Sequence, residues 1–271
     1  MPHIPVMVSE VISYLVWDYG GAYVDCTVGD GMHSRAILEK IYSSEGSVIA
    51  LDRDDRALAT ARVNLEAFGD KVVIAKMRFS EIGSQLRMAT SRLYSGFLFD
   101  LGLNSSRLLE PESGFSYLVD GCLDMRMSGE DKLTAADIIN KWPEKDLADL
   151  FYQKSDEKYS RRIARALANS RKKTPISSTL QLKDIIMRAI PAPYRLKSVA
   201  RCFQALRMTV NDEIDELMSG LMAAFELLVP HGRILVISYH SIEDRIVKHF
   251  FRQHRRPWWR HPKLGPPDRD E

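Results

Sequence analysis

The sequence predicts an α/β fold in which a parallel, Rossmann-like sheet is interrupted by an inserted helical domain. Three observations lead to this prediction. Short, nearly continuous apolar segments alternate with segments of helical periodicity over the first hundred residues, which is typical of parallel strands covered on both faces. A glycine-rich turn follows the first apolar segment, where open α/β folds bind ligands. More than one hundred residues of helical character then separate the fourth apolar segment from the fifth.

The first strand is expected at 22–27, because this short run is rich in residues that favour strands and is followed by glycines. A helix is expected next at 34–42, where apolar residues recur at helical spacing. The same cycle then repeats, with a helix at 56–68 and strands at 47–52, 72–77 and 96–101.

The alternation stops after Leu101, and the following segments indicate helices separated by polar breaks, at 135–140, 144–153, 160–170 and 179–189. Strand character returns at 232–239, after a helix at about 212–228 and a stop at Pro230-His231-Gly232. Prolines exclude regular helix from the tail after Arg256, so an extended or disordered tail is expected. The expected division is a sheet domain in two parts (1–104 and 211–255), a helical insertion (105–210) and a basic, proline-rich tail (256–271).

Composition places the chain among ordinary globular proteins, since 45% of its 271 residues are hydrophobic and 27% are charged. The net charge of +2 says little about partners. No apolar run reaches the roughly 18 residues of a membrane span, and the N-terminus lacks the plan of a signal peptide, so a cytoplasmic protein without membrane association is expected. Cys26, Cys122 and Cys202 lie far apart and lack metal-ligand spacing, so neither a disulfide nor a metal site is expected.

A cofactor site is predicted at the end of the first strand. Asp25, Thr27, Gly29 and Gly31 alternate there, and the glycines allow close approach of the backbone to a ligand at a helix N-terminus. Asp52 ends the second strand 21 residues after Gly31, near the interval at which a carboxylate accepts hydrogen bonds from ribose hydroxyls. Together these features indicate an adenosine-containing cofactor.

The nature of the cofactor follows from what the turn lacks. A dinucleotide site needs a third glycine, but Met32 and Ser34 follow Gly31, so a nicotinamide-type oxidoreductase is the weaker alternative. Asp25 would repel a pyrophosphate, whereas it would attract the cationic amino-acid end of S-adenosylmethionine. The methyl donor is therefore the favoured cofactor.

A second polar cluster follows the fourth strand, at Asp100, Asn104, Ser105 and Ser106. The carboxyl edge of a parallel sheet is the ligand-binding edge, so these groups are expected beside the cofactor. Asp100 could bind the adenine, the amine of the donor or an acceptor amine, and the sequence leaves these roles open.

Several colinear blocks lie between about His3 and Phe251: HIPV at 3–6, DCTVGDGMHS at 25–34, LDRD at 51–54, DLGLNS at 100–105, GFS at 114–116, DGCLDMRM at 120–127, FQALR at 203–207, NDE at 211–213 and SYHSIEDR at 238–245. Two stretches within them, LDMRM at 123–127 and HSIEDR at 240–245, are not general methyltransferase features. Together the blocks resemble the RsmH (MraW) family of 16S ribosomal RNA cytidine N4-methyltransferases.

The resemblance implies a class I methyltransferase fold that uses S-adenosylmethionine to methylate N4 of a cytidine in the decoding (P-site) region of the small ribosomal subunit. It implies that the helical insertion and the loop at 238–245 help to shape the RNA-facing side. Arg107 is also placed in the donor site, although the family usually has Gln at this position. The sequence departs from the family at two further places: Met32 stands where Gly is usual, and Lys197-Ser198 stand where His-Pro is usual. The donor-site residues carried over are Gly31, Met32, His33, Asp52, Phe79 and Asp100.

Two basic segments are candidates for RNA contact. The run from Lys158 to Lys173 contains seven basic residues and no acid, and the run from Arg245 to Lys263 contains seven more beside Trp258 and Trp259, whose rings could stack on bases. The candidate RNA-binding residues are Arg161, Arg162, Arg165, Lys172, Lys173, Arg201, Arg245, Lys248, Trp258 and Trp259.

For the reaction itself, Asp100, Asn104 and His240 are the candidates to hold the acceptor amine in line with the methyl group. The departures at Met32, Arg107 and Lys197 leave open a non-catalytic RNA-binding or ribosome-assembly factor on the same fold. The sequence does not decide between a monomer and a homodimer.

Overall fold

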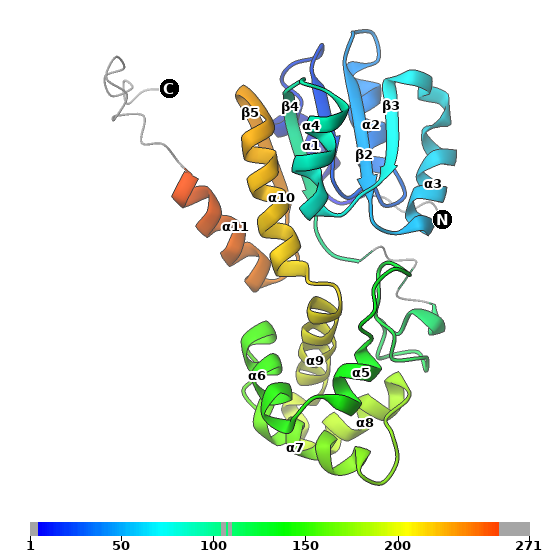
Figure 1. Ribbon diagram of the computed structural model, residues 1–271, viewed down its shortest axis with the longest axis vertical. Helices are drawn as coiled ribbons and strands as arrows, with labels where there is room; N and C mark the ends of the chain where they lie inside the picture. The colour runs from blue at the N-terminus through cyan, green and yellow to red at the C-terminus, as the bar shows by residue number, and fades with distance from the viewer. Residues whose placement is uncertain (1–4, 104–106, 108–109, 255–271) are drawn as a thin grey trace.

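The computed structural model describes residues 5–103, 107 and 110–254. Five strands form one parallel sheet in the order β3-β2-β1-β4-β5, so the predicted Rossmann-like sheet is confirmed (Figure 1). The strands are β1 Ala22–Asp25, β2 Ser47–Asp52, β3 Val72–Lys76, β4 Tyr94–Asp100 and β5 Leu228–Ile237.

Helices cover both faces of this sheet, each over its own apolar core. Along β1 the side chains alternate, so Tyr23 packs into one core while Val24 packs into the other. One face carries α1 Val8–Leu15, α2 Met32–Ile41 and α3 Asp55–Leu65, and the other carries α4 Ile82–Ala89, α10 Glu213–Leu227 and α11 Ser241–His254. Short 3-10 segments, η1 Glu66–Lys71 and η2 Phe79–Glu81, flank β3.

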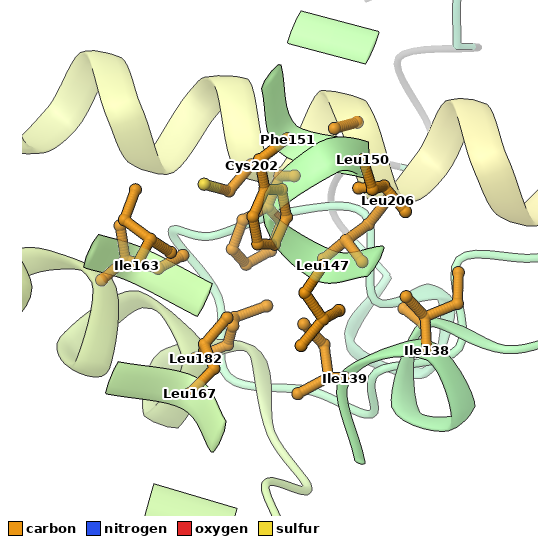
Figure 2. Close-up of a cluster of buried hydrophobic side chains, with 14 of the residues drawn as sticks. Ile138, Ile139, Leu147, Leu150, Phe151, Ile163, Leu167, Leu182, Cys202 and Leu206 are labelled. Atoms are coloured by element: carbon orange, nitrogen blue, oxygen red, sulfur yellow. The ribbon is translucent and has the colours of Figure 1, made fainter. Parts of the chain in front are cut away.

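A separate group of helices lies beyond one end of the sheet, with its own buried core (Figure 1). Figure 2 shows Phe151 at the centre of this core, surrounded by aliphatic side chains such as Leu147, Leu167 and Leu206. The elements are η4 Pro111–Ser113, α5 Ala135–Lys141, α6 Glu144–Ser155, α7 Ser160–Arg171, α8 Thr179–Ala189, η5 Ala192–Tyr194 and α9 Arg195–Val210.

A partly buried polar network joins the helical group to the sheet. The guanidinium of Arg53, just beyond β2, donates to Asp131 Oδ2 (2.8 Å) and to the carbonyl of Asn211 (2.9 Å). Arg78, beyond β3, donates to the other oxygen of Asp131 (2.6 Å). Asn211 in turn donates to the carbonyl of Met125 (2.7 Å). Charge-assisted bonds of this kind fix the helical group against the tips of two strands.

Most predicted elements agree with the structure within a few residues, but four helices were not predicted: α1, α4, α9 and α11. The predicted stop at Pro230-His231-Gly232 is wrong, because β5 already starts at Leu228 and these residues form an irregularity between the pairs Tyr94–Leu228 and Gly96–Arg233. An edge strand tolerates proline at such a bulge. The expected loop at 238–245 is helical from Ser241 onward.

The tail from Arg256 lies outside the described residues, so its predicted extended or disordered state is untested. In the described part of the chain, no helix has both the length and the apolar character required to cross a membrane.

Removal of the Phe151 ring is expected to destabilise the helical group. Phe151→Ala leaves a cavity in a fully buried core, so the free energy of unfolding in urea should fall by about 3–5 kcal/mol. The neighbouring Tyr152 is 62% exposed and is the matched control; Tyr152→Ala should change stability by less than about 0.5 kcal/mol. Equal losses in the two variants would contradict this assignment of the core.

Candidate active site

A cavity of about 290 Å³ opens at the carboxyl edge of the sheet. Its wall is built from the residues that end or follow β1, β2, β3 and β4, together with the first turns of α10. Parallel pairing brings these strand ends to one edge, which is the ligand-binding edge of open α/β sheets. The size is close to the lower end of the range for small-molecule pockets, about 300 Å³.

Asp52 forms a polar wall of the cavity at the end of β2. Its Oδ2 accepts a hydrogen bond from the backbone N–H of Gly29 (3.0 Å), and its Oδ1 accepts one from that of Asp54 (2.9 Å). Gly29 has φ +50°, which L residues rarely adopt. Burial raises the pKa of Asp52 to about 6, although the two backbone hydrogen bonds oppose this shift. The carboxylate is therefore held rigidly, with acceptor capacity remaining for a ligand hydroxyl.

An apolar slot lies beside Asp52. Phe79, at the start of η2, packs edge-on against Phe99 with ring centroids 5.3 Å apart, and Met77 and Leu217 line the same cavity. A Cβ at Gly220 would lie 2.9 Å from Phe79 Cβ, so this glycine lets α10 approach the ring. A slot of this kind suits a flat heterocycle.

Asp100, the last residue of β4, is held from several directions. Its backbone N–H donates to the Thr27 hydroxyl (2.7 Å), and the Tyr239 hydroxyl donates to its Oδ1 (2.9 Å). His33 Nδ1 lies 3.5 Å from its Oδ2, while the His33 Nε2–H donates to the carbonyl of Val6 (2.9 Å). This arrangement gives the Asp100 carboxylate one orientation at the cavity wall.

Tyr239 keeps its proton at neutral pH. Burial, and then the hydrogen bond to the Asp100 carboxylate, raise the pKa of the phenol to about 12. It therefore remains a donor to Asp100 over the physiological range.

Arg107 lines the cavity, but much of its hydrogen-bonding capacity is directed at the protein. Its Nε lies 3.1 Å from Asp54 Oδ2, and one terminal nitrogen donates to the carbonyls of Arg126 (3.0 Å) and Met127 (3.2 Å). Arg107 thus joins the segment after β4 to the tip of β2 and to the loop before α5. Met32 lies on the same cavity wall.

A second cluster at the cavity edge contains Glu213, His240 and Glu243, whose potential ligand atoms lie within 4.8 Å of one another. Sequence spacing gave no sign of this grouping. His240 Nε2 lies 3.1 Å from Glu243 Oε1, while Arg207 Nε lies 2.8 Å from Glu213 Oε1. The charge of Glu213 is thus already compensated by a guanidinium.

Two residues predicted to bind the cofactor do not line the cavity. Asp25 is fully buried, and its carboxylate accepts hydrogen bonds from the Ser34 hydroxyl (2.6 Å) and the Thr27 N–H (3.2 Å), so it stabilises the turn after β1. Gly31, with φ +86°, faces Leu65 of α3, where a Cβ would lie 3.2 Å from Leu65 Cγ. The predicted contact of Asp25 with a cationic ligand is therefore wrong, because its carboxylate is used inside the fold.

The other predicted positions divide into three groups. Gly29, Met32, His33, Asp52, Phe79, Asp100 and Arg107 line the cavity. His240 lies beside it, through its contact with Glu243. Asn104, Trp258 and Trp259 lie outside the described residues.

The basic candidates differ in what they contact. Arg161, Arg162, Arg165, Lys172 and Lys173 are exposed on or just after α7, and Arg165 forms a 3.6 Å ion pair with Glu144. Lys248 pairs with Asp244 one turn away on α11. Such exposed pairs are weak, so these side chains can exchange partners.

Arg201 and Arg245 have tertiary partners. Arg201 lies 3.7 Å from Glu157, which is fully buried, so its guanidinium supports the interior of the helical group. Arg245 of α11 donates to Asp156 (3.2 Å), next to the start of α7. This ion pair holds α11 beside the connection between α6 and α7, two residues before the first basic segment begins at Lys158.

Sequence reasoning did not select several cavity residues. Tyr239 and Glu213 both lie within blocks that carry the family resemblance, SYHSIEDR and NDE, so the signal was present without an assigned role. Met77 and Leu217 gave no signal, because they look like any other core residue.

Comparison with known proteins identifies the family. The profile described as the MraW methylase family matches residues 1–263. The relative named Ribosomal RNA small subunit methyltransferase H from Carboxydothermus hydrogenoformans is 44% identical over 257 residues, which cover 94% of this chain and 82% of the relative. Its namesake from Heliobacterium mobile is 44% identical over 253 residues, which cover 92% and 81%. The same name is carried by a Dehalococcoides mccartyi protein, 45% identical over 253 residues, which cover 93% and 71%. With its Rossmann-like class I methyltransferase fold, the chain belongs to the MraW methylase family.

Proposed function

We propose that this protein is an S-adenosylmethionine-dependent methyltransferase that methylates N4 of a cytidine in the decoding region of small-subunit 16S ribosomal RNA. The observation that carries the proposal is one cavity that joins a ribose-type carboxylate, Asp52, and an apolar slot to an oriented carboxylate, Asp100. The names of the relatives support RNA of the small subunit as substrate. The proposed location is the cytoplasm.

The residues on the cavity wall fit this donor. Asp52 would accept hydrogen bonds from the ribose hydroxyls, and Phe79 with Leu217 would hold the adenine in the apolar slot. When bound, the donor supplies a methyl group carried on a positively charged sulfur. The negative charge of the nearby carboxylates favours binding of this cation.

Asp100 would hold the acceptor. The exocyclic amine of cytosine is a poor nucleophile because its lone pair is delocalised into the ring, so alignment must supply much of the acceleration. The Asp100 carboxylate is fixed by Tyr239 and by its position at the end of β4, so it can accept a hydrogen bond from the amine. As the nitrogen gains the methyl group it loses one proton, and Asp100 would accept that proton.

The helical insertion, 105–210, would recognise the RNA. Arg245 of α11 donates to Asp156, four residues before α7 begins, so the exposed arginines of α7 and Arg245 would together provide a basic surface for phosphates. The acceptor base would be turned out of its stack to reach the cavity. A protein that binds ribosomal RNA but transfers no methyl group would instead be an assembly factor on this fold.

Binding of the demethylated donor product should depend on pH through Asp52. The pKa of about 6 means that Asp52 is protonated increasingly below pH 6, and a protonated carboxyl loses acceptor capacity, so affinity should fall there and level off above pH 7. Calorimetric titration with S-adenosylhomocysteine between pH 5 and 8 measures this dependence. Asp52→Asn should bind about 10–100-fold more weakly and lose the pH dependence. A wild-type curve that is flat across this range would exclude the proposed contact.

Asp100→Ala is expected to remove turnover while it preserves donor binding. Loss of the group that positions the amine and accepts its proton should lower kcat by about 10²–10⁴-fold. The measurement is transfer of labelled methyl to small ribosomal subunits and to naked ribosomal RNA, followed by nucleoside analysis. S-adenosylhomocysteine affinity is the control and should change by only a few fold. Near-normal turnover would rule out this role for Asp100.

The arginines of α7 should contribute to the salt dependence of RNA binding. Replacement of Arg161, Arg162 and Arg165 by Ala removes three phosphate contacts, so the slope of log affinity against log salt should decrease by about 2 for a single-stranded RNA. The matched control replaces Arg35, Arg62 and Arg87, which are exposed on helices that cover the sheet. Equal slopes for both triple variants would place the RNA elsewhere.

A further inference from the structure

Tyr239 is an aromatic residue of the cavity wall that remains largely exposed and is not needed to hold the donor. Tyr239 lines the cavity, yet it is 55% exposed, whereas the Phe79 ring packs into the core beneath the sheet. It lies between the end of β5 at Ile237 and the start of α11 at Ser241, so the chain constrains it from both sides.

The Tyr239 ring is held in place although it is not buried. At one end its hydroxyl donates to Asp100 (2.9 Å), and at the other its backbone N–H donates to Glu243 (3.2 Å). The ring lies close to the backbone of Gly102, where a Cβ would be 3.2 Å from Tyr239 Cδ2. Gly102 also has φ +118°, so a side chain at this position would be strained as well as crowded.

An ordered and exposed aromatic ring is suited to stacking. Its rotation is already restricted by the bond to Asp100 and by Gly102, so a partner that stacks on it meets little further loss of side-chain entropy. Nucleic-acid bases commonly stack on such rings, and every base offers a suitable face. The ring is also directed toward Asp100, the carboxylate that would receive the amine.

We infer that Tyr239 is the stacking platform for the acceptor base and sets the position of its exocyclic amine relative to Asp100. The inference rests on the proposed RNA methylation. A pyrimidine stacked on the phenol ring, with its amine on the side of the hydroxyl, brings that amine close to the carboxylate that the hydroxyl contacts. The ring therefore supplies position, while Asp100 supplies the hydrogen bond.

Two variants separate the ring from the hydroxyl. Tyr239→Leu removes the aromatic face, and Tyr239→Phe keeps the face but loses the bond to Asp100. Tyr239→Leu should lower kcat/KM for RNA by about tenfold to a hundredfold, which is the range expected for loss of one base–aromatic stack. In Tyr239→Phe, kcat/KM for RNA should fall by a smaller factor. S-adenosylhomocysteine affinity should stay within about threefold of wild type in both. Tyr42→Leu, at another exposed tyrosine, is the matched control and should leave kcat/KM unchanged.

A direct readout uses an RNA with a fluorescent cytosine analogue at the target position. Stacking should quench its emission in the wild type and in Tyr239→Phe, and the quenching should be lost in Tyr239→Leu. The inference is overturned if the wild type transfers methyl groups but Tyr239→Leu matches it, if the Phe variant loses as much as the Leu variant, or if Tyr239→Leu loses affinity for S-adenosylhomocysteine. If the wild type methylates no RNA at all, the failure lies in the proposed function instead.

Discussion

Parallel strand pairing is the constraint on which the site depends. It brings the carboxyl ends of β1, β2, β3 and β4 to one edge, and the acidic residues Asp52 and Asp100 end two of these strands. Backbone N–H groups in the turns beyond the strands are not used in the sheet ladder, so they can fix carboxylates, as Gly29 and Asp54 do for Asp52. The position of the cavity is thus a consequence of the sheet topology. The side chains at the strand ends determine which ligand the cavity can bind.

The same edge also receives the helical group. Asp131 lies between the guanidinium groups of Arg53 and Arg78, and although burial raises its pKa, these two charges outweigh burial and the net pKa lies below its ordinary value. Loss of either partner would leave a largely buried charge without full compensation, which is costly. The network therefore couples the position of the helical group to the strand tips that line the cavity.

Similar carboxylates at this edge have different uses. Asp25 is buried against Ser34 and Thr27 and stabilises the turn, whereas Asp100 lies on the cavity wall against Tyr239. The difference comes from direction, because Asp25 points toward the start of α2 while Asp100 reaches the cavity. An acidic residue at a strand end indicates a binding site at that edge of the sheet. The direction of its side chain decides whether the carboxylate reaches the cavity.

The sequence by itself determined the alternation of strands and helices, the helical insertion and the glycine-and-carboxylate pattern around Asp52, because periodicity and turn chemistry depend on neighbouring residues. It also carried the blocks that identify the family. Only the tertiary structure decided that Tyr239 meets Asp100, 139 positions away, and that Asp25 turns inward. It also revealed α9, whose apolar residues pack on several sides and so weaken the helical pattern. Contacts between distant residues are set by the packing of whole elements, which no local pattern records.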